Sequence, residues 1–145
     1  MRHQIQIGVR SWLYLRRIMY KIERHLLLHL EKYDLTPAQF GVLANLQAAP
    51  EISQQALANR LFVTKGNIVG LLNRLECRGL VQRRPDPEDG RTHIVSLTEQ
   101  GATLAAQVVP AHERLVTEYM GLISDEDQLA LHNLLRTLNR SLGPD

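Results

Sequence analysis

Three arginines lie on either side of a short acidic turn in the second half of the chain. Arg83 and Arg84 precede the stretch PDPEDG, and Arg91 follows it directly. A guanidinium group is permanently charged and can pair with two oxygens of a carboxylate or a phosphate at once. These side chains are therefore suited either to neutralising the neighbouring acids or to binding an anionic partner.

The segment before these arginines has an unbalanced charge. Residues 52–75 contain Arg60, Lys65 and Arg74 and no aspartate or glutamate. Such a local excess of positive charge favours a polyanion as partner, although a solvated helical face would have the same composition. The formal net charge of the whole chain, +2, does not decide between the two.

The residues typical of catalysis are not arranged in any catalytic pattern. The stretch HERLV at residues 112–116 begins like a zinc-protease motif but lacks the second histidine. The sequence also lacks a glycine-rich phosphate loop, a Gly-x-Ser-x-Gly elbow and a Cys-x-x-Cys pair. We therefore predict that the protein is not an enzyme, with no catalytic residues and no cofactor.

Two weaker patterns suggest sensing. His25 and His29 are four residues apart on a predicted helix and could share a metal ion, but no third ligand is evident, so we predict no metal site. Cys77 lies near Arg74 and Arg78, which could lower the pKa of its thiol and make it redox-responsive. The favoured interpretation of Cys77 is a small buried core residue.

Length and composition favour one folded domain. The chain has 145 residues, of which 44% are hydrophobic, and a single cysteine that cannot form an internal disulfide. No apolar run approaches the ~20 residues that span a membrane, and the first residues lack the features of a signal peptide. We expect a cytoplasmic protein with no membrane contact.

Apolar spacing predicts a long first helix over residues 8–31. Six residues recur at steps of three and four, namely Trp12, Leu15, Met19, Ile22, Leu26 and Leu30. The run of leucines at 26–28 widens this stripe beyond one face. A helix with so broad an apolar surface must be buried from two sides, which indicates a partner chain.

Three shorter helices and a hairpin follow. Thr36 begins the first with a capping-box pattern, Ser53 begins the second, and Thr64 begins the third, which Gly79 ends. Strands are predicted at residues 80–83 and 92–97, joined by the acidic turn. Thr98 then begins a long helix to about residue 122. Ser124 begins the last helix, with an apolar stripe of Leu131, Leu134, Leu135 and Leu138.

This order of elements is that of a winged helix-turn-helix. The fold class we predict is mainly α with a small β-hairpin wing (α+β), flanked by long N- and C-terminal helices that pair two chains. In such a fold the second helix of the pair enters the major groove of DNA, so its outward face should be polar or small. The candidate DNA-binding residues are Ser53, Gln54, Thr64, Lys65, Gly66, Asn67, Gly70, Asn73, Arg74, Arg83, Arg84, Asp89 and Arg91.

Roles can be divided among these residues. Lys65, Asn67 and Asn73 are expected to read or approach base edges, and an asparagine amide can pair bidentately with adenine. Ser53 and Gln54 open a helix whose free amides suit a phosphate, and Arg74 and either Arg83 or Arg84 are also expected to hold phosphates.

The sequence resembles the MarR family of bacterial transcriptional regulators over nearly its whole length. The stretches that carry the resemblance are LTPAQFGVLANL, RLECRGLVQR, the Asp89-Gly90-Arg91 triplet and SLTEQG. It implies one MarR-type domain over 1–145, with dimerisation helices at 1–34 and 110–145. The DNA-binding lobe would span 35–100, with the helix-turn-helix at about 53–76 and the wing at about 80–97.

The resemblance also implies partners. These are a second copy of the chain and double-stranded DNA with a pseudo-palindromic operator. The usual effect is repression, often relieved by a small phenolic or other ligand. Alternatives from other classes are a helical protein-interaction module and a metal- or redox-responsive regulator. The basic bias of residues 52–75 and the hairpin arginines argue against a pure interaction module.

The resemblance also leads to expectations for two sites. One is the pair of glycines in the third short helix, and the other is the tip of the wing. Family members often have Ser, Thr or Arg where this chain has Gly66 and Gly70. The two glycines either allow close approach of the helix backbone to DNA or leave it few base contacts. At the wing, we predict that Asp89 pairs with Arg91 and aims it into the minor groove, and that Gly90 closes the turn with a positive φ.

A ligand site is predicted on the first helix. Trp12, Arg16 and Tyr20 share one face at steps of four residues. In the family, ligands lie between the dimerisation helices and the DNA-binding lobe, and an aromatic wall with a cation would suit a small aromatic or anionic effector. The alternative is that Trp12 and Tyr20 pack in the dimer interface.

Overall fold

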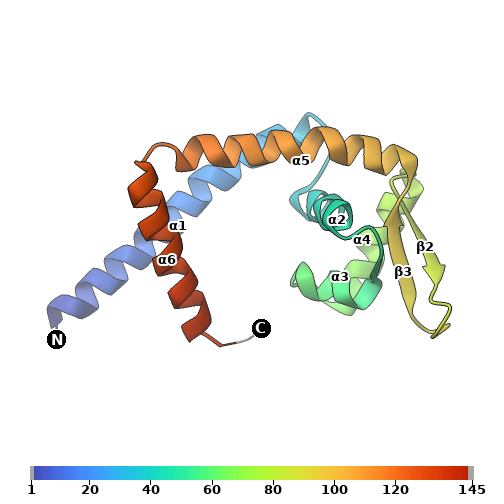
Figure 1. Cartoon of the computed structure of the whole chain (residues 1–145), viewed down its shortest axis with the longest axis horizontal. Helices are drawn as coiled ribbons and strands as arrows, with labels where there is room; N and C mark the ends of the chain where they lie inside the picture. The colour runs from blue at the N-terminus through green and yellow to red at the C-terminus, as the bar shows by residue number, and fades with distance from the viewer. Residues whose placement is uncertain (1, 144–145) are drawn as a thin grey trace. The chain divides into compact units, whose positions relative to one another are not determined.

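The protein is mainly helical with one small antiparallel sheet, as predicted (Figure 1). The computed structural model describes residues 2–143, and their side chains from residue 6 onward. The elements are α1 (Arg2–Glu31), α2 (Pro37–Ala48), β1 (Ile52–Ser53), α3 (Gln54–Arg60), α4 (Lys65–Cys77), β2 (Val81–Pro85), β3 (His93–Leu97), α5 (Glu99–Met120) and α6 (Asp125–Ser141). The chain divides into two compact units, Met1–His112 and Glu113–Asp145, each considered by itself below.

Helix starts follow the predicted capping residues. The Thr36 side chain accepts a hydrogen bond from the backbone N–H of Gln39, whose own side chain accepts from the N–H of Thr36, which completes a capping box. Ser53 and Thr64 cap α3 and α4 in the same way, through the amides of the third residue that follows each. Local chemistry therefore sets these boundaries.

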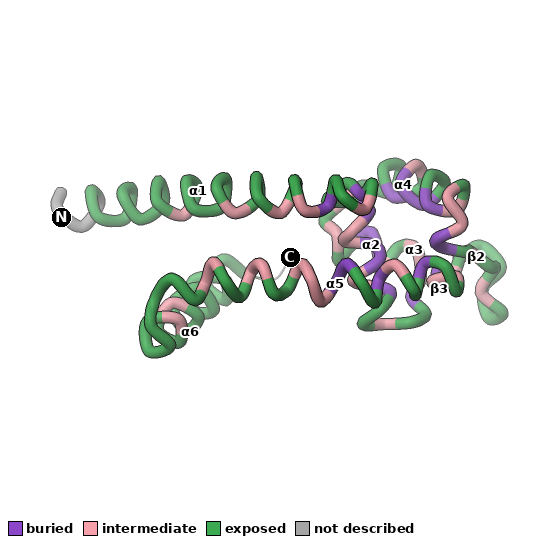
Figure 2. The backbone as a smooth tube through the Cα atoms, turned by 90° about the horizontal axis from the view of Figure 1, so that it is seen from above, coloured by how far each residue is buried: buried purple, intermediate pink, exposed green. Residues whose placement is uncertain are grey.

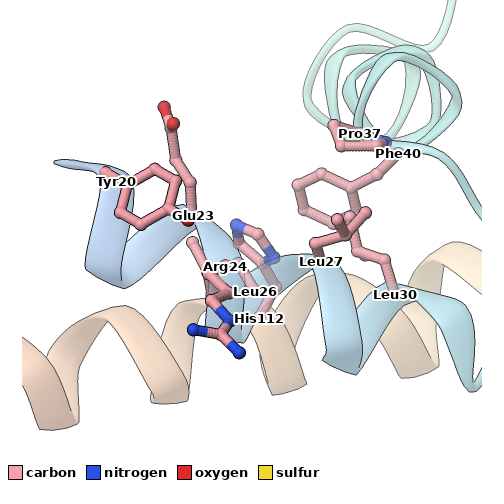
Figure 3. Close-up of a pocket in the computed structure, with 9 residues that line it drawn as sticks. All are labelled: Tyr20, Glu23, Arg24, Leu26, Leu27, Leu30, Pro37, Phe40 and His112. Atoms are coloured by element: carbon pink, nitrogen blue, oxygen red, sulfur yellow. The ribbon is translucent and has the colours of Figure 1, made fainter.

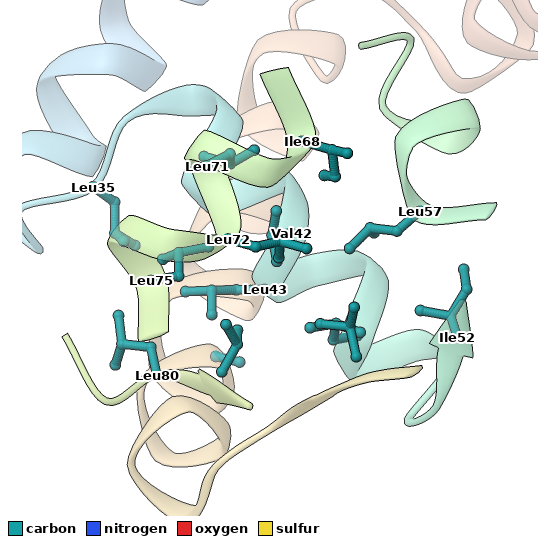
Figure 4. Packing of buried hydrophobic residues seen from close by; sticks show 14 of the residues in the cluster. Leu35, Val42, Leu43, Ile52, Leu57, Ile68, Leu71, Leu72, Leu75 and Leu80 are labelled. Atoms are coloured by element: carbon teal, nitrogen blue, oxygen red, sulfur yellow. The ribbon is translucent and has the colours of Figure 1, made fainter. Parts of the chain in front are cut away.

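The core of the first unit lies where α2, α3 and α4 meet the sheet. Val42 and Leu43 of α2 and Leu72 and Leu75 of α4 have no exposed surface, and Leu57 of α3 packs among them (Figure 4). The predicted inward set of α4, Ile68, Leu71, Leu72 and Leu75, is buried throughout. Its spacing places it on one side of the helix, which leaves the opposite side free to face outward.

The sheet has one strand more than predicted. Its order is β1-β3-β2, all antiparallel, with Ile52 opposite Val95 and Val81 opposite Leu97. The two-residue strand β1 was missed because a run this short has no alternation to detect. The predicted hairpin is confirmed, but its first strand begins and ends later than predicted, at Val81–Pro85, and its second strand begins at His93.

The base of the wing is joined to the start of α5. Thr98 donates its hydroxyl hydrogen to the carbonyl of Gly79 at 2.6 Å, and its oxygen accepts the amide of Gly101 at 3.0 Å. A Cβ at Gly101 would lie 1.8 Å from the carbonyl oxygen of Leu80. Only glycine allows this approach, which gives a structural reason for the SLTEQG stretch.

The long outer helices expose apolar side chains. Most of α1 is exposed along its length (Figure 2). Leu30 of this helix is buried, whereas Trp12 and Met19 are each more than half exposed. On α6 no residue is buried, and Leu134 is 69% exposed. None of the helices in the described part of the chain combines the length and apolarity needed to cross a membrane. These two surfaces are large for a chain that functions alone.

Candidate nucleic-acid interface

The outward face of α4 is polar, basic and accessible. Lys65, Asn67, Asn73 and Arg74 are all exposed, and Thr64 is exposed at the start of the helix. The backbone there is held by the bond from the Asn67 amide to the Thr64 hydroxyl at 3.2 Å, so the first turn is ordered before any partner binds. These are the properties expected of a helix that reads the edges of bases.

The two glycines of α4 have no neighbour that requires them. A Cβ at either Gly66 or Gly70 would meet no atom within 4 Å. Glycine in a helix costs about 1 kcal/mol relative to alanine, and nothing in the fold compensates for this cost. The packing of the protein alone therefore does not explain these two residues.

Arg83 joins three elements instead of pointing freely outward. Its guanidinium donates to Asn73 and Glu76 of α4, both at 2.5 Å, and to Gln54 of α3 at 3.4 Å. The hydrogen bond from Arg83 lowers the pKa of Glu76, and the same bond raises the pKa of Arg83. Of the predicted contact residues, Gln54, Asn73 and Arg83 are thus brought together, because Arg83 donates to both of the others.

Glu76 was not singled out by sequence reasoning. It contacts the wing because β2 runs back along α4, which is a non-local relationship. The sequence feature that could have identified Glu76 is its negative charge. Glu76 is the first acid after the acid-free segment 52–75, and it lies seven residues before Arg83. A single acid at that spacing is too common to have identified the pair.

The remaining wing residues are more exposed. Arg84 forms an ion pair with Glu51 at 2.8 Å, with 46% of the arginine side chain exposed. Arg91 is exposed at the end of the turn. Both are accessible to a polyanion that approaches the wing.

Two predictions about the tip of the wing are wrong. Asp89 does not form an ion pair with the Arg91 side chain; its carboxylate accepts the backbone N–H of Arg91 at 3.1 Å and the Thr92 hydroxyl at 3.1 Å. Gly90 has no positive φ, because Asp86 and Asp89 close the turn through side-chain-to-backbone bonds of the kind common in turns. Asp89 therefore orients the backbone that carries Arg91.

The predicted burial of Cys77 is also wrong. Cys77 is exposed, because it lies two residues beyond the buried Leu75 and so on the other side of α4. Among the described residues, no group of three His, Cys, Asp or Glu side chains could hold a metal ion. His25 and His29 are not part of such a group.

A cavity of about 730 Å³ lies between α1, α2 and His112 of α5 (Figure 3). Its wall is largely apolar, with Leu27 and Leu30 from α1 and Phe40 from α2, and the Phe40 ring stacks on His112 at 4.1 Å between centroids. Tyr20 lines it, whereas Trp12 and Arg16 do not. The charged residues at the cavity are Arg24 and Glu23.

Fold and surface together define a winged helix-turn-helix protein with an exposed recognition helix. The family model described as MarR family matches residues 33–92. The transcriptional regulator HosA of Escherichia coli is 35% identical over 105 residues, which cover 72% of this chain and 78% of that protein. The chain belongs to the MarR family, which confirms the predicted resemblance; it is a transcriptional regulator and not an enzyme.

Solved structures agree with this assignment. A mutant of the MarR protein of E. coli, solved in complex with operator DNA, is 29% identical, with a TM-score of 0.81; the match covers 90% of this chain and 94% of that one. AbsC of Streptomyces coelicolor, a MarR family transcriptional regulator, has a TM-score of 0.85 at 24% identity and covers 91% of each chain, which shows the shared fold.

Proposed function

We propose that this regulator binds a pseudo-palindromic DNA operator as a homodimer and represses transcription from it. The observation that carries the proposal is the outward face of α4, which is exposed, basic and ordered at its first turn. The similarity to a MarR protein that was solved with operator DNA supports it. Repression follows if the bound dimer covers a site that the transcription machinery needs.

Within this proposal, contacts divide into three groups. Lys65 and Asn67 approach base edges, and Gly66 and Gly70 let the backbone of α4 come close to them. Ser53, Arg74 and Arg84 hold phosphates, while Arg91 enters the minor groove from the wing. Asn73, Gln54 and Arg83 take a different role from the one first expected: Arg83 donates to Asn73 and to Gln54, which holds the wing against α4 and α3.

A homodimer is supported by the exposed apolar surfaces of α1 and α6. Trp12 and Met19 on α1, and Leu134 and Leu138 on α6, are each at least half exposed. Two copies that bury these side chains together would gain about 25 cal/mol for each Å² of apolar surface removed from water. The two-fold symmetry of such a dimer would match the symmetry of the operator. The regulator would act in the cytoplasm, where the DNA is.

The test is selection of bound duplexes from a random pool, followed by sequencing. We expect an inverted repeat whose half-sites are about one helical turn apart. Recovery of unrelated sequences, with affinity that depends only on salt, would contradict a sequence-specific operator. Reporter transcription with the selected site upstream then measures the sign of regulation.

The cavity beside α1 supports release by a small ligand. Its apolar wall and the Arg24 cation suit a small aromatic carboxylate better than the Trp12 and Arg16 face, which lies outside it. Glu23 would disfavour a second negative charge. Benzoate should displace the wild-type protein from the selected operator, and Arg24→Gln should raise the concentration needed; equal displacement of both would rule out this cavity.

A further inference from the structure

In the described part of the chain, three helices end in the same hydrogen-bonding pattern. In each, a residue with positive φ follows the helix, its amide binds the carbonyl three residues back, and the next amide binds the carbonyl five residues back. These residues are Asp34 after α1, Phe62 after α3 and Gly79 after α4, with φ of 54°, 53° and 69°. The backbone requirement is therefore the same at all three sites.

Only one of the three sites has a large side chain. Glycine adopts this conformation without strain, and aspartate is among the residues that tolerate it best, whereas a bulky residue is an outlier there. Phe62 nevertheless adopts it, with its amide bound to Asn59 at 3.2 Å. Glycine at this position would satisfy the same hydrogen bonds at lower cost.

The fold does not compensate for the strain at Phe62. The residue is 77% exposed, so its ring does not contribute to the core that the neighbouring Val63 packs against. The backbone strain lowers the stability of the free protein, and the exposed ring provides no burial that offsets this cost. The ring is therefore explained better by a contact that the free chain lacks.

The surroundings of Phe62 indicate what that contact is. It lies in the turn between the two helices of the helix-turn-helix, two residues before the Thr64 cap of α4. Arg60 and Lys65 on either side are exposed, and residues 52–75 have no acid. Gly66, in the first turn of α4, has no side chain that would fill the space beside this face. A polyanion that meets this face would come within reach of the ring.

We propose that Phe62 is an apolar DNA contact, placed by its strained backbone against the sugars and base edges beside the entry point of α4. This inference rests on the proposed DNA binding. Apolar side chains serve duplex recognition by packing on thymine methyl groups and on the edges of bases. The ring adds affinity without adding a charge, unlike its two basic neighbours.

The proposal predicts opposite effects on stability and on binding. Phe62→Gly should raise the Tm by roughly 4 °C, because it relieves the backbone strain. The same change should weaken binding to the selected operator about five- to tenfold, because the apolar contact is lost. Phe62→Tyr retains the ring and the strain, and should bind within about twofold of wild type.

Asp34→Gly is the matched control. It also places glycine at the same kind of helix end, after α1, and keeps the backbone carbonyl that accepts from Arg78; it removes only the exposed Asp34 carboxylate, which lies 3.8 Å from Arg78. It should leave operator affinity unchanged. A general effect of adding glycine to a helix end would weaken binding in this variant too, and would overturn the proposal.

The salt dependence identifies the kind of contact. Loss of an apolar contact should leave the slope of log affinity against log salt at the wild-type value, whereas Arg74→Ala, which removes a proposed phosphate contact, should lower it by about one. Unchanged affinity in Phe62→Gly, or a lost affinity that comes with a reduced slope, would overturn the proposal. Failure of wild type to bind any duplex would instead refute the proposed function.

Discussion

Asn67 is the residue on which specific reading depends most in the proposed complex. Its side chain is exposed on the first turn of α4, and its backbone N–H is bound to the Thr64 hydroxyl, so the backbone that carries the side chain is held before DNA arrives. If Asn67 pairs with adenine, Asn67→Ala should weaken binding to the selected operator by ~1–3 kcal/mol. Titration against a scrambled duplex is the control, and an equal loss there would mean that Asn67 contacts only the backbone.

Glu76 links the pH to the stability of the lobe. Because the hydrogen bond from Arg83 lowers its pKa in the folded state, the bond stabilises the fold above the unfolded pKa of about 4.5 and is lost as pH falls through the lower folded value. Glu76→Gln should lower the free energy of unfolding by about 1 kcal/mol at pH 7 and by less at pH 3, which lies below the unfolded pKa. Urea unfolding at both pH values measures this.

Glu51→Gln is the control for that experiment. It also removes an acid bound to a wing arginine, but the Glu51 side chain is 61% exposed, whereas that of Glu76 is 32% exposed. An exposed pair contributes little, so this variant should unfold like wild type at both pH values. A parallel loss in both variants would show that wing charge in general, and not the bond to α4, sets the stability.

At the scale of helices, the glycines of α4 and α5 have opposite roles. Gly70→Ala has open space and should stabilise the free protein by up to about 1 kcal/mol, whereas Gly101→Ala would collide with the Leu80 backbone and should destabilise it by about 2 kcal/mol or more. Thermal unfolding distinguishes them. Titration of Gly70→Ala with the operator then separates the two explanations of Gly70. Weaker binding supports close approach of the helix backbone to DNA, and unchanged binding supports a helix with few base contacts.

In the proposed complex the wing supplies the Arg91 cation to the DNA, and Asp89 orients the backbone that carries it. Arg91→Ala should weaken operator binding by ~1–3 kcal/mol and lower the salt slope by about one. Asp89→Ala should weaken binding as well, although it removes a negative charge, because the amide of Arg91 and the hydroxyl of Thr92 both lose their partner.

Glu88→Ala removes the same charge from the same turn and is the control for Asp89. The Glu88 side chain forms no hydrogen bond or ion pair with the described residues, so its loss should leave binding unchanged or slightly tighter. If Asp89→Ala binds as tightly as Glu88→Ala, the orienting role is wrong and the turn acts only through its charge.

For the whole molecule, assembly depends on the outer helices. Leu135 of α6 is 41% exposed in the single chain, beside the more exposed Leu134 and Leu138. We predict a homodimer at micromolar concentration, and Leu135→Glu should shift it towards monomer because the dimer would bury an uncompensated charge. Sedimentation equilibrium measures this. A folded wild-type monomer at that concentration would contradict the dimer.

The sequence by itself determined the parts of this protein that depend on near neighbours in the chain. The Thr36 capping box, the caps at Ser53 and Thr64 and the buried set of α4 all follow from residues three or four apart, because helical hydrogen bonds and helical faces have that spacing. These signals were strong enough to predict the order of elements and, with the quoted motifs, the family.

Only the tertiary structure decided the relationships between distant residues. From the sequence, Arg83 and Asn73 are predicted to be independent DNA contacts. In the fold β2 runs back along α4, so that Arg83 donates to both Asn73 and Glu76. The positive φ of Phe62 and the close approach of Gly101 to Leu80 could not be predicted from the sequence either. The physical reason is that such contacts depend on how separate elements pack, and a backbone conformation imposed by packing leaves no periodic pattern in the sequence.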